Sequence, residues 1–184
     1  MEEQAADLLL GLCDDNFASK PLYGRNFVVI GSGSELSPTR FLLEAGANVY
    51  AIQTRKPQKW KELADFAKGT SGNLYIPCFD QTPSVENGGV DLLKELPEIA
   101  LWLQNELENK TSEYLTVGKY VYMDGEAHIR STAASFMISK HLMENLKISK
   151  EKLSFAYLGT PSIACVIPKA AHDASKNQMK PVGA

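Results

Sequence analysis

The sequence lacks the cysteine patterns that would indicate a metal site or a disulfide framework. Its three cysteines, Cys13, Cys78 and Cys165, are far apart, and none lies in a CxxC or Cys/His cluster. Neither a zinc site nor a set of structural disulfides is therefore predicted. This usage favours a reducing compartment, either the cytoplasm or the matrix or stroma of an organelle.

The chain also lacks long apolar runs and an excess of positive charge. No run approaches the roughly 18 apolar residues that suggest a membrane span, and the acidic start Met-Glu-Glu-Gln has no signal-peptide pattern. The formal net charge of -3 gives no overall attraction to nucleic acid or to anionic membranes. The expected partners are therefore a small molecule or a protein, with no nucleic acid and no membrane span.

What the sequence contains is enough apolar material for one domain. A chain of 184 residues with 44% apolar side chains can bury a sufficient core without disulfides or structural metal ions. We expect an N-terminal helix and lead-in over residues 1–25, one main domain over residues 26–168 and a C-terminal tail over residues 169–184.

Apolar strand patterns and amphipathic helix patterns alternate along that central part. Near-continuous apolar strands separated by helices indicate a mainly parallel sheet of about five to six strands with helices on both faces, a three-layer α/β/α fold. The strands are expected at residues 26–30, 49–53, 73–79, 119–123 and 153–158, with a short extended piece at 163–167. The helices are expected at residues 2–13, from 38 to the glycine at 46, around 60–67, at 97–108 and at 129–146.

A glycine-containing turn follows the first strand and reads Gly31-Ser-Gly-Ser-Glu-Leu-Ser-Pro38. Gly31 and Gly33 would let the backbone approach a pyrophosphate closely, and a helix beginning after them would offer unpaired N–H groups to it. The third glycine of the usual dinucleotide fingerprint is missing. The alternative interpretation is a turn that joins a strand to a helix and holds no ligand.

The end of the second strand bears on which dinucleotide would bind. An acidic residue at this place selects the free ribose of NAD, whereas an arginine accommodates the 2′-phosphate of NADP. The chain has Arg55 and Lys56 and no acid until Glu62, which favours NADP over NAD. Two alternatives stay open: Arg55 is a solvated loop charge, or no cofactor is retained.

The stretches GRNFVVIG, PCFDQTP and YVYMDG, taken in this order, resemble the short-chain dehydrogenase/reductase superfamily. The resemblance implies a Rossmann-like fold and an NADP-dependent oxidoreductase acting on a small carbonyl or alkene. Glu35 and Ser37 stand where that family has glycines, and Asp124 replaces an alanine of the turn after its fourth strand. The cofactor-binding residues predicted from the loop chemistry and the resemblance are Gly31, Ser32, Gly33, Ser34, Glu35, Leu36, Arg55, Phe79, Asp80, Asp124 and Gly125.

The catalytic residues of that family are not plainly present. The family uses a Tyr-x-x-x-Lys pair, in which a lysine one helical turn away lowers the pKa of the phenol. No such pair occurs in the sequence. The segment from His172 to Lys176 resembles it with histidine in place of tyrosine, and Thr160 stands where a serine is expected. The alternative is a chance match in a polar tail.

A second class of function therefore stays open. The sequence ends soon after the fifth predicted strand, so it is either part of a longer protein or a shortened Rossmann domain whose sheet edge a protein partner covers. The latter would be a non-catalytic subunit that stabilises a larger assembly. A methyltransferase that uses S-adenosylmethionine also has a glycine loop, but the missing acid after the second strand disfavours it.

Overall fold

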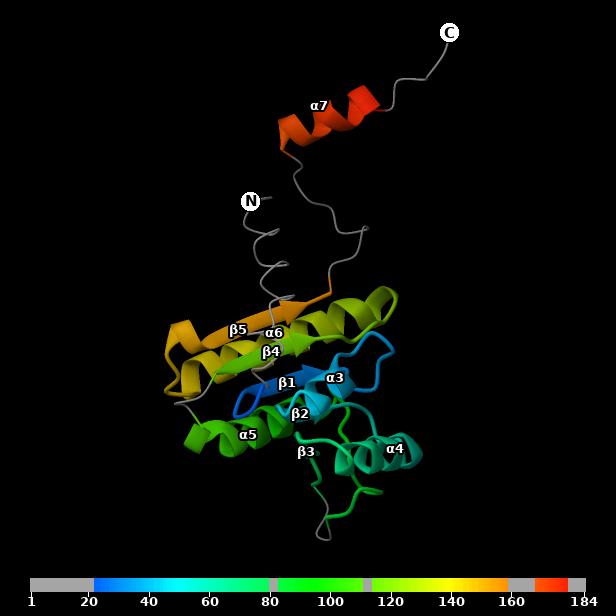
Figure 1. Cartoon of the computed structure of the whole chain (residues 1–184), viewed down its shortest axis with the longest axis vertical. Coiled ribbons are helices and arrows are strands. Elements are labelled where there is room, and N and C mark those ends of the chain that lie inside the picture. Colours follow the sequence, from blue (N-terminus) through cyan, green and yellow to red (C-terminus); the bar gives the residue numbers. More distant parts are fainter. Residues whose placement is uncertain (1–21, 80–82, 111–113, 159–167, 179–184) are drawn as a thin grey trace.

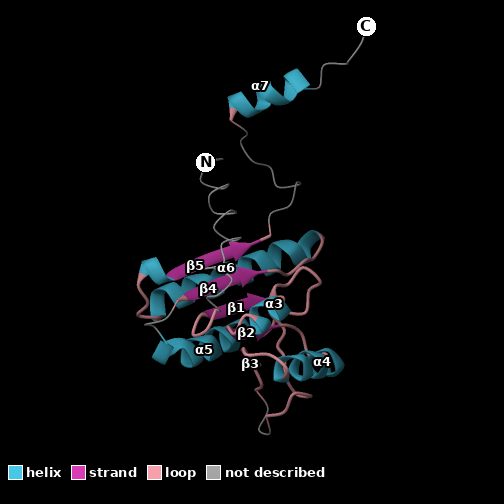
Figure 2. Cartoon of the chain, in the orientation of Figure 1, coloured by secondary structure: helices cyan, strands magenta, loops and turns pink. Residues whose placement is uncertain are grey.

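The fold is built on one five-stranded sheet, which the computed structural model shows in Figure 1. The structure describes residues 22–79, 83–110, 114–158 and 168–178. The strand order is β3-β2-β1-β4-β5, and all neighbouring pairs are parallel. The arrows of β1, β4 and β5 accordingly point the same way in Figure 2. The strands are β1 (Asn26–Ile30), β2 (Asn48–Ile52), β3 (Asn73–Tyr75), β4 (Leu115–Lys119) and β5 (Leu153–Tyr157).

Helices connect the strands and complete the predicted three-layer α/β fold. Parallel neighbours need long crossovers, and each crossover between described strands contains a helix or helical turns. Within the described part of the chain, no helix is long and apolar enough to cross a membrane, and no group of His, Cys, Asp and Glu could hold a metal ion. The helices are α3 (Thr39–Glu44), α4 (Pro57–Lys68), α5 (Leu96–Leu107), α6 (Gly125–Asn145) and α7 (Lys169–Gln178), with 3-10 turns at Glu108–Lys110 and Lys150–Lys152.

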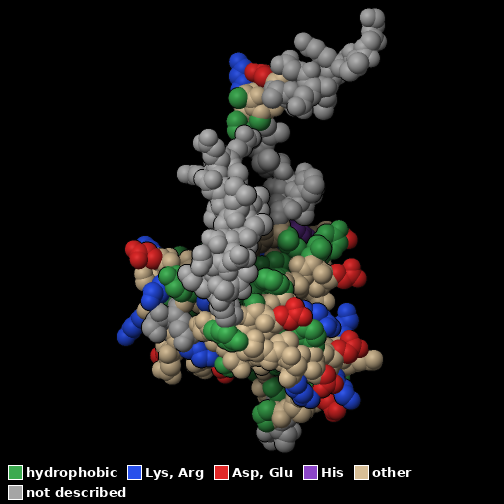
Figure 3. Space-filling view, in the orientation of Figure 1, with side chains coloured by type: hydrophobic (Ala, Val, Ile, Leu, Met, Phe, Trp, Pro, Cys, Tyr) green, Lys and Arg blue, Asp and Glu red, His purple; other side chains and the backbone are tan. Residues whose placement is uncertain are grey.

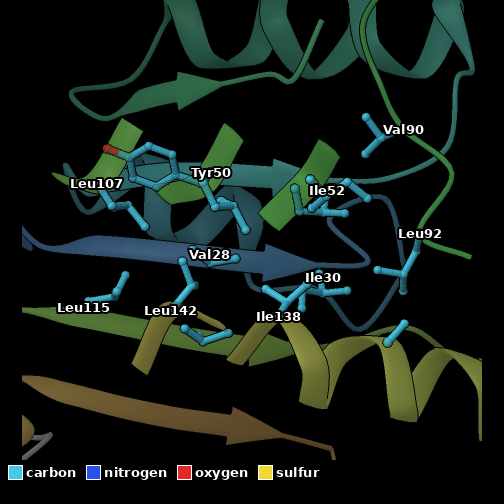
Figure 4. Packing of buried hydrophobic residues seen from close by; sticks show 14 of the residues in the cluster. Val28, Ile30, Tyr50, Ile52, Val90, Leu92, Leu107, Leu115, Ile138 and Leu142 are labelled. Atoms are coloured by element: carbon cyan, nitrogen blue, oxygen red, sulfur yellow. The ribbon is translucent and has the colours of Figure 1, made fainter. Parts of the chain in front are cut away.

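Alternate residues of the central strands pack on opposite faces of the sheet. On β1, Val28 and Ile30 belong to one apolar cluster and Val29 to the other, and all three are at most 1% exposed. Figure 4 shows the first cluster, with side chains of β1 and β2 meeting side chains of the helices. Because both faces of these strands are buried, their sequence is continuously apolar rather than alternating.

Two helices cover each face. The side of Val28 is covered by Ile99, Leu103 and Leu107 of α5 and by Ala134, Ile138 and Leu142 of α6. The side of Val29 is covered by Leu42 and Leu43 of α3 and by Trp60 and Leu63 of α4. This arrangement confirms the predicted α/β/α layering.

Asparagines form a ladder across the start of three strands. Asn26, Asn48 and Asn73 are in register on β1, β2 and β3. The side chain of Asn48 donates to Oδ1 of Asn26 at 3.1 Å and accepts from Nδ2 of Asn73 at 2.9 Å. The ladder ties the amino ends of these strands together, and it pairs the side chain of Asn26, which is only 1% exposed.

A tyrosine pair lies within the cluster on the α5 side. The rings of Tyr50 and Tyr75 stack with centroids 4.5 Å apart, and Nζ of Lys110 donates to both hydroxyl oxygens. Burial raises the pKa of Tyr50 to about 12, against the lowering effect of its hydrogen bond from Lys110. This cluster is at the amino half of the sheet and serves packing.

The strand boundaries agree with the sequence analysis except at the third and fourth strands. β1 was predicted with both ends correct, and β2 and β5 within one residue. β4 lies four residues before its predicted place at 119–123, because its pairing with β1 aligns Leu115 with Asn26 and Lys119 with Ile30. β3 is shorter than predicted, and the predicted helix at 2–13 and extended piece at 163–167 lie outside the described residues.

Candidate functional site

The glycine turn after β1 forms the centre of the candidate site. Gly31 has φ of +92°, a conformation that favours glycine, and its N–H donates to the carbonyl oxygen of Ile52 at 2.8 Å. A Cβ at Gly31 would lie 2.7 Å from the backbone nitrogen of Val121. Glycine is therefore required here by the close approach of the chain that leaves β4.

The end of the turn is closed by hydroxyl groups. The N–H of Thr39 donates to Oγ of Ser37 at 3.3 Å, and Oγ1 of Thr39 donates to the carbonyl oxygen of Ser32 at 3.1 Å. Ser37, which stands where the resembling family has a glycine, thus accepts a hydrogen bond from the first residue of α3. That helix has only six residues, so its dipole contributes little to anion binding, contrary to what the sequence pattern indicated.

An apolar pocket of about 260 Å³ opens at the carboxyl ends of β1 and β2. Its walls are Ile30 and Ile52 from the two strand ends, Val90 and Leu92 from the segment after β3, and Val121 after β4. Parallel strands bring their carboxyl ends to one edge of the sheet, where α/β proteins bind ligands. The pocket has the chemistry of a site for a flat apolar ring.

A polar pocket of about 250 Å³ adjoins it on the side of α3 and α4. Arg40 and Lys59 line this pocket together with Glu35 and Glu62, so its walls carry charges of both signs. The guanidinium of Arg40 also lies 4.5 Å from the centre of the Phe66 ring. The two pockets share a common wall made of Gly33, Ser34, Gln53 and Lys59.

Ser32 contributes a buried hydroxyl to the polar pocket. Its side chain is 5% exposed, and Oγ has no hydrogen-bond partner among the described atoms. A buried hydroxyl without a partner is destabilising, and such groups are uncommon in folded proteins. A ligand atom that pairs with Oγ of Ser32 would remove this cost.

Arg55 does not line either pocket. Its two guanidinium nitrogens donate to the two carboxylate oxygens of Glu95 at 2.7 and 2.5 Å. The same carboxylate accepts from the backbone N–H of Asp91 at 2.7 Å, and the hydrogen bond from Arg55 holds the pKa of Glu95 below its usual value. The guanidinium is thus engaged by an acid 40 residues away in sequence.

Of the residues predicted to bind a cofactor, the structure brings together those of the glycine turn. Gly31, Gly33 and Ser34 line the apolar pocket, and Ser32 and Glu35 line the polar one. The other predicted residues lie elsewhere: Leu36, Arg55 and Phe79 are exposed, Asp124 and Gly125 are at the start of α6, and Asp80 lies outside the described residues.

Of the predicted catalytic residues, His172 is the one whose side chain the structure describes. His172 is exposed on α7, and Lys176 lies one turn further along the same helix. His172 does not line the apolar or the polar pocket. Thr160 lies outside the residues that the structure describes.

Several pocket residues were missed by the sequence analysis. Gln53 directly follows β2, so its position at a strand end was a usable signal. Arg40 and Lys59 face the polar pocket from two different helices, and Val90 comes from an irregular segment. Their convergence depends on the packing of α3 and α4 on the sheet, which no local pattern in the sequence reports.

The strand order, the parallel pairing and the glycine turn at the carboxyl edge define a Rossmann-like α/β domain. No protein-family model and no curated protein matches the sequence. A solved structure from Pseudomonas syringae, provisionally assigned as a short chain dehydrogenase, has a TM-score of 0.52 and 18% identity. The match covers 71% of this chain and 55% of that chain, so it spans little more than half of that protein. At this identity the similarity concerns the fold.

Proposed function

We propose that the chain binds an adenine dinucleotide, NADP in preference to NAD, at the carboxyl ends of β1 and β2. The observation that carries this proposal is the pair of adjoining pockets on the glycine turn, one apolar and one polar. Such a pair suits a ligand that joins a flat ring to a ribose and phosphates. The unpaired hydroxyl of Ser32, buried beside the turn, fits a ligand that accepts or donates a hydrogen bond there.

The preference for NADP is supported by the charges around Gln53. An acidic residue at the end of β2 would favour the free ribose hydroxyls, and the chain has an amide there instead. Arg40 and Lys59 in the polar pocket replace Arg55 as the candidate partners of a 2′-phosphate. Glu35 and Glu62 oppose them, so the preference over NAD is expected to be moderate.

Hydride transfer to a small carbonyl or alkene is the finer part of this proposal. When bound, NADPH would supply the hydride, and the chain would have to supply a proton donor near it. His172 and Lys176 on α7 are the candidates from the sequence. Substituting His172 with alanine should abolish substrate-dependent oxidation of NADPH if this assignment is right, whereas unchanged turnover would remove His172 from the mechanism.

A second candidate function is a non-catalytic subunit of a larger assembly. Ile129 is 70% exposed and Met137 is 52% exposed on α6, and neither lines the apolar or the polar pocket. Exposed apolar side chains gathered on one helix favour a protein interface. Nucleotide binding without any hydride transfer, together with stable association in size-exclusion chromatography that Met137→Lys disrupts, would support this function over the first.

The binding proposal predicts a nucleotide-dependent rise in the unfolding temperature. NADPH at about 100 times its Kd should stabilise the protein by about 2.7 kcal/mol. For a chain of this size that corresponds to a shift of roughly 5–10 °C. Lys59→Ala and Arg40→Ala should each reduce the shift with NADPH more than the shift with NADH, because they remove partners of the 2′-phosphate.

Lys61→Ala is the matched control, because Lys61 is exposed on the same helix as Lys59 and lines neither pocket. Arg55→Ala should leave the NADPH shift in place, since Arg55 is engaged by Glu95. If NADPH and NADH both fail to shift the unfolding temperature, the protein does not bind a dinucleotide at this site. Loss of the shift in Arg55→Ala would instead identify Arg55 as the partner of the 2′-phosphate.

A further inference from the structure

A groove of about 670 Å³ runs between α6 and the edge strand β5. In the sheet, Phe155 and Tyr157 of β5 are in register with Val117 and Lys119 of β4. Phe155 is 48% exposed and Tyr157 is 73% exposed, so this end of the sheet is poorly covered by the described residues. In Figure 3, green apolar side chains gather at the upper right of the body, where Figure 1 places one end of α6.

Two serine hydroxyls on the wall that α6 presents to the groove are paired within the helix. Oγ of Ser135 donates to the carbonyl oxygen of Ser131 at 2.7 Å, and Oγ of Ser139 donates to that of Ser135 at 2.9 Å. Because these hydroxyls are already paired with the helix backbone, they require nothing from an occupant. Phe136 and Met143 complete this wall with exposed apolar side chains.

Lys119 places a positive charge at the end of β4 in this groove. Its ammonium donates to Oγ1 of Thr132, whose own hydroxyl donates to the carbonyl oxygen of His128 at 2.8 Å. An ammonium has three N–H donors, and Thr132 is the one recorded partner of Lys119 within the described segments. Burial lowers the pKa of Lys119, as expected for a cation without a neighbouring acid.

The other charges that line the groove are already paired with each other. Nζ of Lys140 lies 3.8 Å from Oε1 of Glu144, one helical turn away. Lys119 is therefore the basic group in the groove whose charge is left for an occupant to balance, beside the ring of His128. The groove thus combines a long apolar surface with one lysine, Lys119, that has no acidic partner among the described residues.

We propose that the α6–β5 groove binds an aliphatic carboxylate, with its chain along β5 and its carboxylate on Lys119. The volume lies within the range of small-molecule sites, which are mostly apolar with a few polar groups that fix the orientation of the ligand. This site is distinct from the proposed nucleotide site, although Ile30 at the end of β1 lines both the groove and the apolar pocket. The proposal stands without bound nucleotide.

The test compares three ligands that share one chain and differ in head group. Decanoate, decanol and decyltrimethylammonium are titrated by calorimetry into the full chain without nucleotide, below their micellar concentrations. Decanoate should bind tightest and the cation weakest. Lys119→Met should weaken decanoate about tenfold, the factor that corresponds to 1.4 kcal/mol, and leave decanol unchanged.

Lys140→Met is the matched control, because Lys140 lines the same groove but is paired with Glu144. It should leave decanoate binding within about twofold. The proposal is wrong if none of the three ligands binds, or if decanoate and decanol bind equally and Lys119→Met changes neither. It is also wrong if sedimentation velocity shows a dimer that decanoate does not dissociate, since a second copy would then fill the groove.

Discussion

Two lysines beside the sheet show how the same residue type takes different roles. The ammonium of Lys110 is 4.3 Å from the centre of the Tyr75 ring and donates to both tyrosine hydroxyls of its cluster. That of Lys119 has a threonine as its recorded partner and faces an apolar groove. Lys110 is thus part of the packing, whereas Lys119 is placed to interact with a ligand.

The buried hydroxyl of Tyr50 predicts a loss of stability in alkali. Its pKa is raised from 10 to about 12 in the folded protein, so the folded state holds the proton more tightly than the unfolded state. Stability is therefore fully present below pH 10 and falls as the pH rises from 10 towards 12. Urea unfolding measured between pH 8 and pH 11.5 should show this decline, and Tyr50→Phe should reduce it.

Tyr23→Phe is the control for that measurement, because Tyr23 is 61% exposed. It should leave the pH dependence as it is in the unchanged protein. A decline of equal slope in Tyr50→Phe would show that other groups cause the alkaline loss.

At the scale of single residues, the sequence identified the glycine turn but not the partners that decide its chemistry. Gly31, Ser32, Gly33 and Ser34 were predicted from their place after an apolar strand, and they do line the two pockets. The pairing of Arg55 with an acid 40 residues later could not be inferred, because it depends on how the segment before α5 returns to the sheet.

Among the elements, the glycine turn and the segment after β4 are joined by a close contact. The backbone nitrogen of Val121 approaches Gly31 so closely that no side chain fits between them. Gly125, at the start of α6, also has positive φ, +57°, but a Cβ there would meet nothing within 4 Å. Alanine substitutions at these two glycines would therefore distinguish the effect of backbone strain, present at both, from that of steric overlap, present only at Gly31.

Gly125→Ala should cost about 1 kcal/mol of stability, the usual strain of alanine in this conformation. Gly31→Ala should cost more, on the order of 2–4 kcal/mol, because residues 120–121 must also move. Urea denaturation of the two variants gives both values. An equal loss of stability in the two variants would mean that the glycine turn can shift at little cost and that the contact with Val121 does not hold it in place.

The position of β4 shows why some element boundaries are not set locally. Tyr120, Val121, Tyr122 and Met123 have strong strand propensity, which led to the prediction of a strand at 119–123. In the structure Val121, Tyr122 and Met123 lie beyond the end of β4 and line the apolar pocket, with Tyr122 70% exposed. Register with β1 decides the boundary, and that register depends on residues about 90 positions earlier.

In the whole molecule, protection of the sheet should decrease from its centre to the β5 edge. β1 is paired on both sides and its residues from Val28 to Ile30 are buried, whereas β5 pairs with β4 alone among the described strands and is largely exposed. Local openings are easiest where few apolar contacts hold an element. Hydrogen exchange of the backbone amides should therefore be slower in β1 than in β5.

Decanoate should slow exchange in β5 and in the groove-facing part of α6 while leaving β2 and α4 unchanged, because the proposed site lies between β5 and α6. NADPH should have the complementary effect around the glycine turn. If β5 exchanges as slowly as β1 in the free protein, another part of the chain covers this edge.

The asparagine ladder should make the amino end of the sheet less tolerant of substitutions than the carboxyl end. Its side-chain hydrogen bonds fix the register of β1, β2 and β3 at their amino ends, at the opposite end of the strands from the glycine turn. Because both faces of β1 and β2 are buried, a slip of one residue would exchange the side chains that pack in the two apolar clusters, and the ladder opposes such a slip. Replacement of the whole turn by one from a known dinucleotide-binding domain is thus a practical route to designing ligand specificity on this scaffold.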